Sequence, residues 1–149
     1  EGWLYLAVVI DLYSRKAVGW AINKDMKVSL AKEALAMAYF RRRSGKGHLH
    51  HSDRGSQYAA HPYQDQLKQY GMTCSMSRKG DCWDNSVVES FFHRLKTECT
   101  HEKRYLTREE ARADVIDYIE MFYNSARLHS TLGYVSPNDF ENEIRKNAA

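Results

Sequence analysis

The sequence has little that would indicate an extracellular or membrane-spanning protein. Its three cysteines, Cys74, Cys82 and Cys99, are odd in number and lack a C-x-x-C spacing, so we expect reduced thiols rather than disulfides. A zinc site formed by Cys82, Cys99 and His101 would match no usual ligand spacing. The longest apolar run, WLYLAVVI at residues 3–10, is far too short to cross a bilayer. We therefore expect a cytoplasmic protein with no membrane contact.

A large excess of charge of either sign is also lacking, since 22 Lys and Arg face 19 Asp and Glu and the net charge of the 149 residues is only +3. The distribution is more informative, because residues 1–52 carry nine Lys and Arg against four Asp and Glu. The densest part, RRRSGKG at 41–47, is typical of a surface that binds a polyanion, but also of a solvated helix end. Charge alone does not decide between these two interpretations.

Hydrophobic periodicity predicts a mixed α/β domain with helices covering a sheet. Thr107 and Glu110 form a capping box, and Ser136 followed by Pro137 predicts the start of a last short helix. An apolar stripe of Ala111, Val115, Tyr118, Ile119 and Phe122 should face the core. We expect strands over 3–12, 16–23, 48–52 and 72–77, helices over 29–43, 84–99 and 107–125, and a short helix over 61–70.

The helix expected over 84–99 carries a polar stripe. At 100° per residue, one side holds Asn85, Glu89, His93 and Lys96. The opposite side is apolar and should face a core. Taken alone, the stripe is typical of an ordinary solvated helix face with charged neighbours.

A second acid, Asp53, stands in the stretch HHSDRGSQY, after a short predicted strand and before a Gly-Ser turn. Taken alone, it is typical of an aspartate that accepts a hydrogen bond from the turn that follows. Neither acid alone indicates a catalytic site, so their spacing is the more informative feature. The number of residues between Asp53 and Glu89 is 35.

This spacing resembles the second half of the D-D-35-E signature. The segments HSDRGSQY and DNSVVESFFHRLKTE around the two acids, and YNSARLHSTLGYVSP further on, also match motifs of a known family in their order and spacing. Together they resemble the bacterial insertion-sequence transposases of the DDE type, whose catalytic core is similar to retroviral integrase. The resemblance covers nearly all of the chain.

The resemblance implies a ribonuclease-H-like fold, in which a mixed sheet is flanked by helices. It implies one integrase-core catalytic domain over residues 1–149, with a helical extension over about 107–149. It also implies metal-dependent cleavage and strand transfer of DNA at insertion-sequence ends, with a homo-oligomer assembled on transposon and target DNA and located at the nucleoid when active.

The resemblance further implies roles for single residues. Asp53 and Glu89 would be catalytic metal ligands for Mg²⁺ or Mn²⁺, with two ions in the site. Carboxylate oxygens are the hard ligands that such ions prefer. The residues that would contact DNA are Lys96, Asn85, Arg78, Lys79 and His93.

The third acid of such a triad is the remaining question. Asp11 is the candidate within this sequence, but the family places its first aspartate one strand earlier, so we favour a role for Asp11 in the turn at Tyr13 and Ser14. We therefore expect that the first strand and first acid lie upstream of residue 1, and that this chain is impaired or inactive alone. Two alternatives stay open: a non-catalytic DNA-binding or assembly module, and a ribonuclease-H-like nuclease.

Overall fold

The structure is a computed structural model that describes residues 2–11, 13–42, 49–52, 61–70, 73–76 and 86–148. These residues group into two compact units. Residues Gly2–Val9 and Val18–Ser90 form what we call the sheet unit, and Ile10–Ala17 and Phe91–Ala149 form the helical unit. No helix in the described ranges is long and apolar enough to cross a membrane. Each unit is described by itself.

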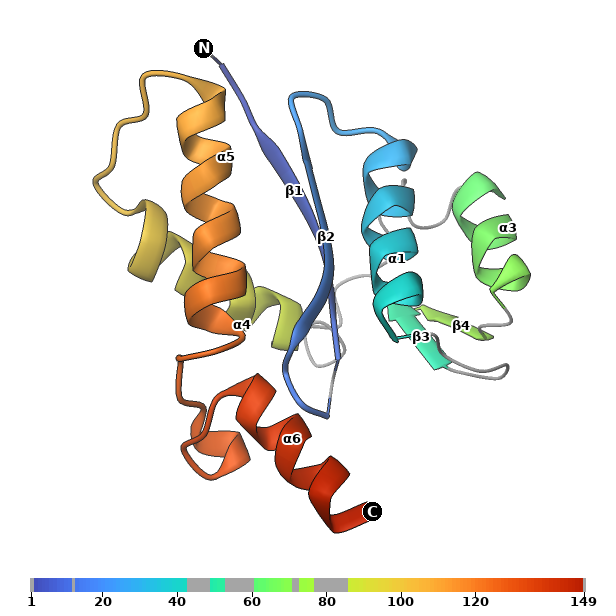
Figure 1. The fold of residues 1–149 in the computed structure, drawn as a ribbon. Coiled ribbons are helices and arrows are strands. Elements are labelled where there is room, and N and C mark those ends of the chain that lie inside the picture. The colour runs from blue at the N-terminus through green and yellow to red at the C-terminus, as the bar shows by residue number, and fades with distance from the viewer. Residues whose placement is uncertain are drawn as a thin grey trace. The chain divides into compact units, whose positions relative to one another are not determined.

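In the sheet unit, one long helix packs along a β-hairpin. Strands β1 (Tyr5–Ile10) and β2 (Ala17–Asn23) pair with each other, and helix α1 (Val28–Arg42) lies along them (Figure 1). Leu30 and Ala34 of the helix form one buried cluster with alanines of both strands. The buried face of α1 therefore consists of the small and aliphatic residues that its 3.6-residue period predicts.

Helix α3 (His61–Gln69) packs against α1 on the other side. The Tyr63 side chain is fully buried in a cluster with Leu35. The Gln66 side-chain amide donates a hydrogen bond of 3.0 Å to the backbone carbonyl of Lys32. The hydrogen bond of Gln66 and the apolar packing of Tyr63 therefore both hold α3 against α1.

Strands β3 (Leu49–Ser52) and β4 (Thr73–Met76) pair in parallel, with Leu49 opposite Thr73. Because α3 lies between them in the sequence, they form a β-α-β crossover. The mixed α/β composition expected from the order of the elements is confirmed. Among the described residues the four strands form two two-stranded sheets, β1 with β2 and β3 with β4.

Helix α4 (Ser86–Leu95) spans the boundary between the two units, and its residues from Phe91 on belong to the helical unit. Two segments of the helical unit are π-helical, with wider turns than an α-helix. Its further elements are the π segment η1 (Lys96–Thr100), α5 (Arg108–Asp117), the π segment η2 (Tyr118–Tyr123), the 3₁₀ turn η3 (Ser130–Leu132) and α6 (Pro137–Ala148).

The π segments correct two expectations. The predicted α-helices over 84–99 and 107–125 each change to π geometry in their last part. Phe122 was expected in the core, but it is 43% exposed and Tyr123 is buried instead. In a π turn, residues five apart stack along the axis, so Tyr118 and Tyr123 share the buried side.

The predicted helix starts are confirmed. The Thr107 hydroxyl accepts a hydrogen bond of 3.1 Å from the Glu110 backbone N–H, and Ser136 caps α6 through the N–H of Asp139 at 3.2 Å. The Glu110 carboxylate accepts a hydrogen bond from the backbone N–H of Leu106 rather than from that of Thr107. The capping box is therefore displaced by one residue on its acidic side.

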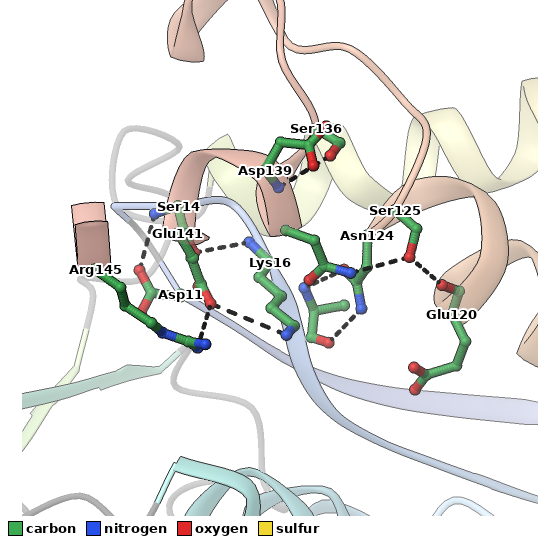
Figure 2. A network of polar contacts seen from close by, with 12 residues as sticks. Asp11, Ser14, Lys16, Glu120, Asn124, Ser125, Ser136, Asp139, Glu141 and Arg145 are labelled. Carbon is green, nitrogen blue, oxygen red and sulfur yellow. Dashed lines mark hydrogen bonds and ion pairs between the residues drawn. The ribbon is translucent and has the colours of Figure 1, made fainter. Parts of the chain in front are cut away.

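A buried amide joins the end of η2 to the first residue of β2. The Asn124 side chain accepts a hydrogen bond from the Ala17 N–H and donates one to the Ala17 carbonyl, both at 2.9 Å (Figure 2). Asn124 thereby satisfies both backbone groups of Ala17, as a neighbouring strand would.

Replacing Gly19 by alanine should destabilise the protein by roughly 1–3 kcal/mol or more. A Cβ atom there would lie 2.1 Å from the Ala34 carbonyl oxygen and 2.8 Å from the Ala38 nitrogen, so α1 would have to move off β2. Denaturant unfolding measures the loss. The control is Gly133→Asn, because that site is open and asparagine tolerates its left-handed backbone. An unchanged midpoint for Gly19→Ala would contradict this packing.

Candidate active site

Helix α4 carries the part of the predicted site that the structure describes. Glu89, His93 and Lys96 are all exposed, and Phe91 and Leu95 on the opposite side are buried. The predicted division of this helix into a polar and an apolar side is confirmed for these residues. Lys96 is the first residue of η1, so it still follows Glu89 by about two α-helical turns.

The other predicted site residues lie outside the described part of the chain. This holds for Asp53, the second acid, and for three predicted DNA contacts, Arg78, Lys79 and Asn85. Within the described ranges, no group of three or more His, Cys, Asp or Glu side chains is placed to hold a metal ion. The structure thus presents Glu89 as an accessible carboxylate and leaves the assignment of the site a prediction.

Asp11 makes the contacts expected of a turn residue. Its Oδ1 atom accepts hydrogen bonds from the backbone N–H groups of Tyr13 at 2.8 Å and Ser14 at 3.0 Å. Its backbone N–H and carbonyl pair with Lys16 and Arg15 at 2.9 and 2.8 Å. These bonds close the hairpin turn, as the interpretation from sequence predicted.

The same turn is held by the last helix (Figure 2). The buried Ser14 hydroxyl donates a hydrogen bond to the Glu141 carboxylate, which lies 3.9 Å from both Lys16 Nζ and Arg145 Nη2. The Glu141 side chain is nearly buried, so its charge is balanced by these cations rather than by water alone. Sequence analysis gave no signal for this contact, because the partners lie at opposite ends of the chain.

Sequence analysis also missed a carboxylate bridge around Glu98. Arg127 donates to both oxygens of Glu98 through Nε at 2.9 and 3.1 Å and through Nη2 at 3.0 Å. The Tyr118 hydroxyl adds a bond of 2.6 Å, and Arg94 Nη1 lies 4.0 Å away. The bridge links η1, η2 and the segment after η2. No sequence signal indicated it, because Tyr118 and Arg127 lie 20 and 29 residues after Glu98.

The charges within this bridge reinforce each other. Burial raises the pKa of the Glu98 carboxyl, but the bonds from Arg127 and Tyr118 outweigh it, so the pKa lies below its usual value. Burial and the bond to Glu98 raise the pKa of Tyr118. Near neutral pH, Glu98 is therefore a carboxylate and Tyr118 a neutral donor.

His129 lies against the same group, with its ring edge-on to Tyr123 at 5.1 Å between centroids. The side chain is buried, and Nε2 has no hydrogen-bond partner among the described residues. Burial is the main reason that the pKa of His129 falls to about 4, and the positive charges of Arg127, Arg94 and Arg15 add to it. The imidazole is therefore neutral near pH 7.

A second polar cluster surrounds Asp114. Its Oδ2 atom accepts hydrogen bonds from Lys103 at 2.8 Å, Tyr105 at 2.6 Å and the Cys99 thiol at 3.6 Å. Burial and the Asp114 charge raise the pKa of Cys99 to about 11, so this thiol is not a nucleophile at neutral pH. The cluster fastens η1 to α5.

Comparison with known proteins places these features in a family. A sequence model of the integrase core domain matches residues 1–82, and a second model of the same description matches residues 89–144. The chain belongs to the integrase core domain family. The predicted resemblance is thereby confirmed.

Curated relatives of the integrase core chain are bacterial transposases. It is 52% identical over 143 residues to "Transposase InsF for insertion sequence IS3A" of Escherichia coli strain K12, a match that covers 96% of the chain and 50% of the relative. It is 45% identical over 141 residues to the transposase for insertion sequence element IS904 of Lactococcus lactis, with 95% and 56% covered. The chain thus spans about half the length of the curated relatives it matches.

Solved structures similar to the chain are retroviral integrases. The simian T-cell lymphotropic virus intasome has a TM-score of 0.68 at 16% identity, over 91% of this chain and 47% of that one. The catalytic core of BIV integrase has a TM-score of 0.64 at 17% identity, over 99% and 93%. The HTLV-2 integrase core in complex with magnesium has 0.56 at 14%, over 91% and 82%. These likenesses confirm the ribonuclease-H-like α/β fold.

Acid should destabilise the protein partly through His129. Its pKa is about 4 in the folded protein and near 6.5 in the unfolded chain, so between these values the unfolded chain binds the proton more readily. Above pH 6.5 His129 therefore does not lower the free energy of unfolding, and the free energy of unfolding decreases as the pH falls from 6.5 toward 4. Between pH 7 and pH 5 the loss should be about 2 kcal/mol.

The measurement is the free energy of unfolding at both pH values. His129→Gln cannot take up the proton, so its stability should change less over this interval. The exposed His101→Gln variant is the matched control and should keep the wild-type dependence. Equal pH dependence in all three proteins would contradict the neutral, buried state of His129.

Proposed function

We propose that the chain is the catalytic core of an insertion-sequence transposase, which cleaves DNA strands at element ends and joins them to target DNA with the aid of divalent metal ions. The observation that carries this proposal is the 52% identity to an insertion-sequence transposase over 96% of the chain. The integrase-like fold and the exposed Glu89 on α4 support it. The protein would act in the cytoplasm at the nucleoid.

Asp53 and Glu89 are the proposed metal ligands. The exposed Glu89 carboxylate is a hard oxygen donor of the kind that Mg²⁺ and Mn²⁺ prefer, so its chemistry fits such an ion. When bound, two ions would supply activation of the attacking hydroxyl and charge stabilisation at the leaving oxygen. Asp11 is not proposed as a ligand, because its Oδ1 atom is used by the turn.

The remaining polar residues of α4 would hold DNA beside Glu89. Lys96 offers a flexible ammonium to a phosphate, and the exposed His93 offers ring N–H or N groups on the same side. Asn85, Arg78 and Lys79 are proposed to extend this contact. An oligomer on DNA is proposed as well, supported by the likeness to a subunit of a solved intasome.

Removing either proposed ligand should abolish metal binding and strand transfer. In calorimetric titration with Mn²⁺, Asp53→Asn and Glu89→Gln should each bind at least about tenfold more weakly than the wild type. Glu109→Gln, which removes an exposed acid from α5, is the matched control and should bind as the wild type does. Any strand-transfer activity that the wild-type chain shows with Mg²⁺ should be lost in the first two variants only.

Other results would favour the alternatives. Equal Mn²⁺ binding by all four proteins would remove Asp53 and Glu89 from the metal site and favour a non-catalytic DNA-binding module. Cleavage of RNA in hybrids without strand transfer would indicate a nuclease. Loss of activity in Asp11→Asn with unchanged stability would show that Asp11 is the first acid.

Lys96→Gln should weaken DNA binding to a similar degree for all sequences, because a phosphate contact carries no base information. The slope of log affinity against log salt concentration should become shallower by about 1. Fluorescence anisotropy over a salt series measures both quantities. Lys146→Gln removes an exposed lysine from α6 as the control, and an equal effect of the two variants would contradict a specific role for Lys96.

A further inference from the structure

Three aromatic side chains meet where helices α1 and α3 end. The rings of Tyr39 and Tyr70 are stacked, with their centroids 3.9 Å apart and an angle of 6° between their planes. The Phe40 ring packs edge-on against both, with its centroid 5.4 Å from that of Tyr39 and 6.3 Å from that of Tyr70. We call these three residues the aromatic patch. All of them belong to the sheet unit.

The aromatic patch is positioned by both helices and is nevertheless open to solvent. Gln66 Nε2 donates hydrogen bonds of 3.0 Å to the Tyr70 hydroxyl and to the backbone carbonyl of Lys32 on α1. Phe40 is 64% exposed, although aromatic side chains usually bury much of their large apolar surface. An exposed phenylalanine packed on a fixed tyrosine pair presents an aromatic surface that is ordered before any partner binds.

The last turns of the two helices carry positive charge. Arg41 directly follows Phe40 at the end of α1. Arg42 lies three residues after Tyr39, and therefore on the same side of the helix. The last turn of α3 adds Lys68, and neither of these two described turns contains Asp or Glu. The attraction of cations to a helix C-terminus accounts for the charges alone, but it gives no reason for an exposed phenylalanine among them.

We propose that the aromatic patch binds an unpaired base of single-stranded DNA, with Arg41 and Arg42 holding the adjoining phosphates. Proteins that bind single strands combine aromatic side chains, on which bases stack, with cations that follow the backbone. The negative charge of the strand complements that of the two last turns. This inference rests on the proposed function, which supplies DNA as the substrate. It adds the unpaired state of that DNA and a set of residues that the α4 contacts do not include.

The test measures fluorescence anisotropy in metal-free buffer with two labelled probes, a short thymidine oligonucleotide and an abasic oligonucleotide of the same length. The probes carry the same phosphates, but only the first has bases that can stack. The wild type should bind the thymidine probe about tenfold more tightly than the abasic probe. Phe40→Ala should lose this preference and still bind the abasic probe. Phe40→Trp should keep the preference, because tryptophan retains an aromatic ring on which a base can stack.

Two further variants separate stacking from charge. Tyr134→Asn is the matched control, because it removes an aromatic side chain that is 71% exposed and outside the patch, at a left-handed backbone position that asparagine tolerates. It should keep the wild-type preference for the thymidine probe. Arg41→Gln should weaken the binding of both probes. It should also make the slope of log affinity against log salt concentration shallower by about 0.7, the value for one phosphate of a single strand.

Three results would overturn the proposal. The first is a wild type that binds both probes equally, and the second is a Phe40→Ala variant that keeps the preference for the thymidine probe. The third is a dimer of the wild type that Phe40→Ala separates in analytical ultracentrifugation without DNA, which would make the patch a contact between two copies. Because neither metal nor strand transfer enters these measurements, their failure would leave the proposed metal site untouched. Conversely, Glu89→Gln should keep the preference while losing Mn²⁺ binding.

Discussion

The bridge between Glu98 and its partners is the interaction on which most of the helical unit depends. One carboxylate receives the two-pronged guanidinium of Arg127 and the hydroxyl of Tyr118. A bond of this kind is stronger than a neutral one, and removing Glu98 would leave the largely buried Arg127 side chain without the carboxylate that balances its charge. The bridge therefore fixes η1 against η2 and draws the segment after η2 to both.

The tail motif YNSARLHSTLGYVSP has a structural role that its resemblance alone could not reveal. Asn124 replaces a strand partner for Ala17, and Ser136 caps α6. From α6, Glu141 then reaches the Ser14 hydroxyl in the hairpin turn. These contacts join residues 107 and 127 positions apart in the sequence. The motif thus serves to fasten the last helix to the turn that Asp11 closes.

The local elements were predictable because local forces determine them. The buried residues of α1, the capping serine and threonine, and the turn role of Asp11 all follow from periodicity and short-range hydrogen bonds. The π segments were not predictable, because the spacing of apolar residues does not distinguish a π turn from an α turn at a helix end. The contact between Glu98 and Tyr118, which lie one in each π segment, was equally unpredictable because they are 20 residues apart. Glu89 and Lys96 lie exposed as predicted, whereas their partner Asp53 lies outside the described residues.

The bridge at Glu98 shows why charge counted along the chain does not locate an ion pair. Residues 100–149 carry seven Lys and Arg against nine Asp and Glu, a net charge of −2, which gives no reason to single out Arg127. Yet Arg127 of this acidic stretch and Arg94 of α4 both lie beside Glu98, and Arg127 donates hydrogen bonds to both carboxylate oxygens. Coulomb energy depends on distance in space, so the fold, and not the average charge of a segment, decides which opposite charges stabilise each other.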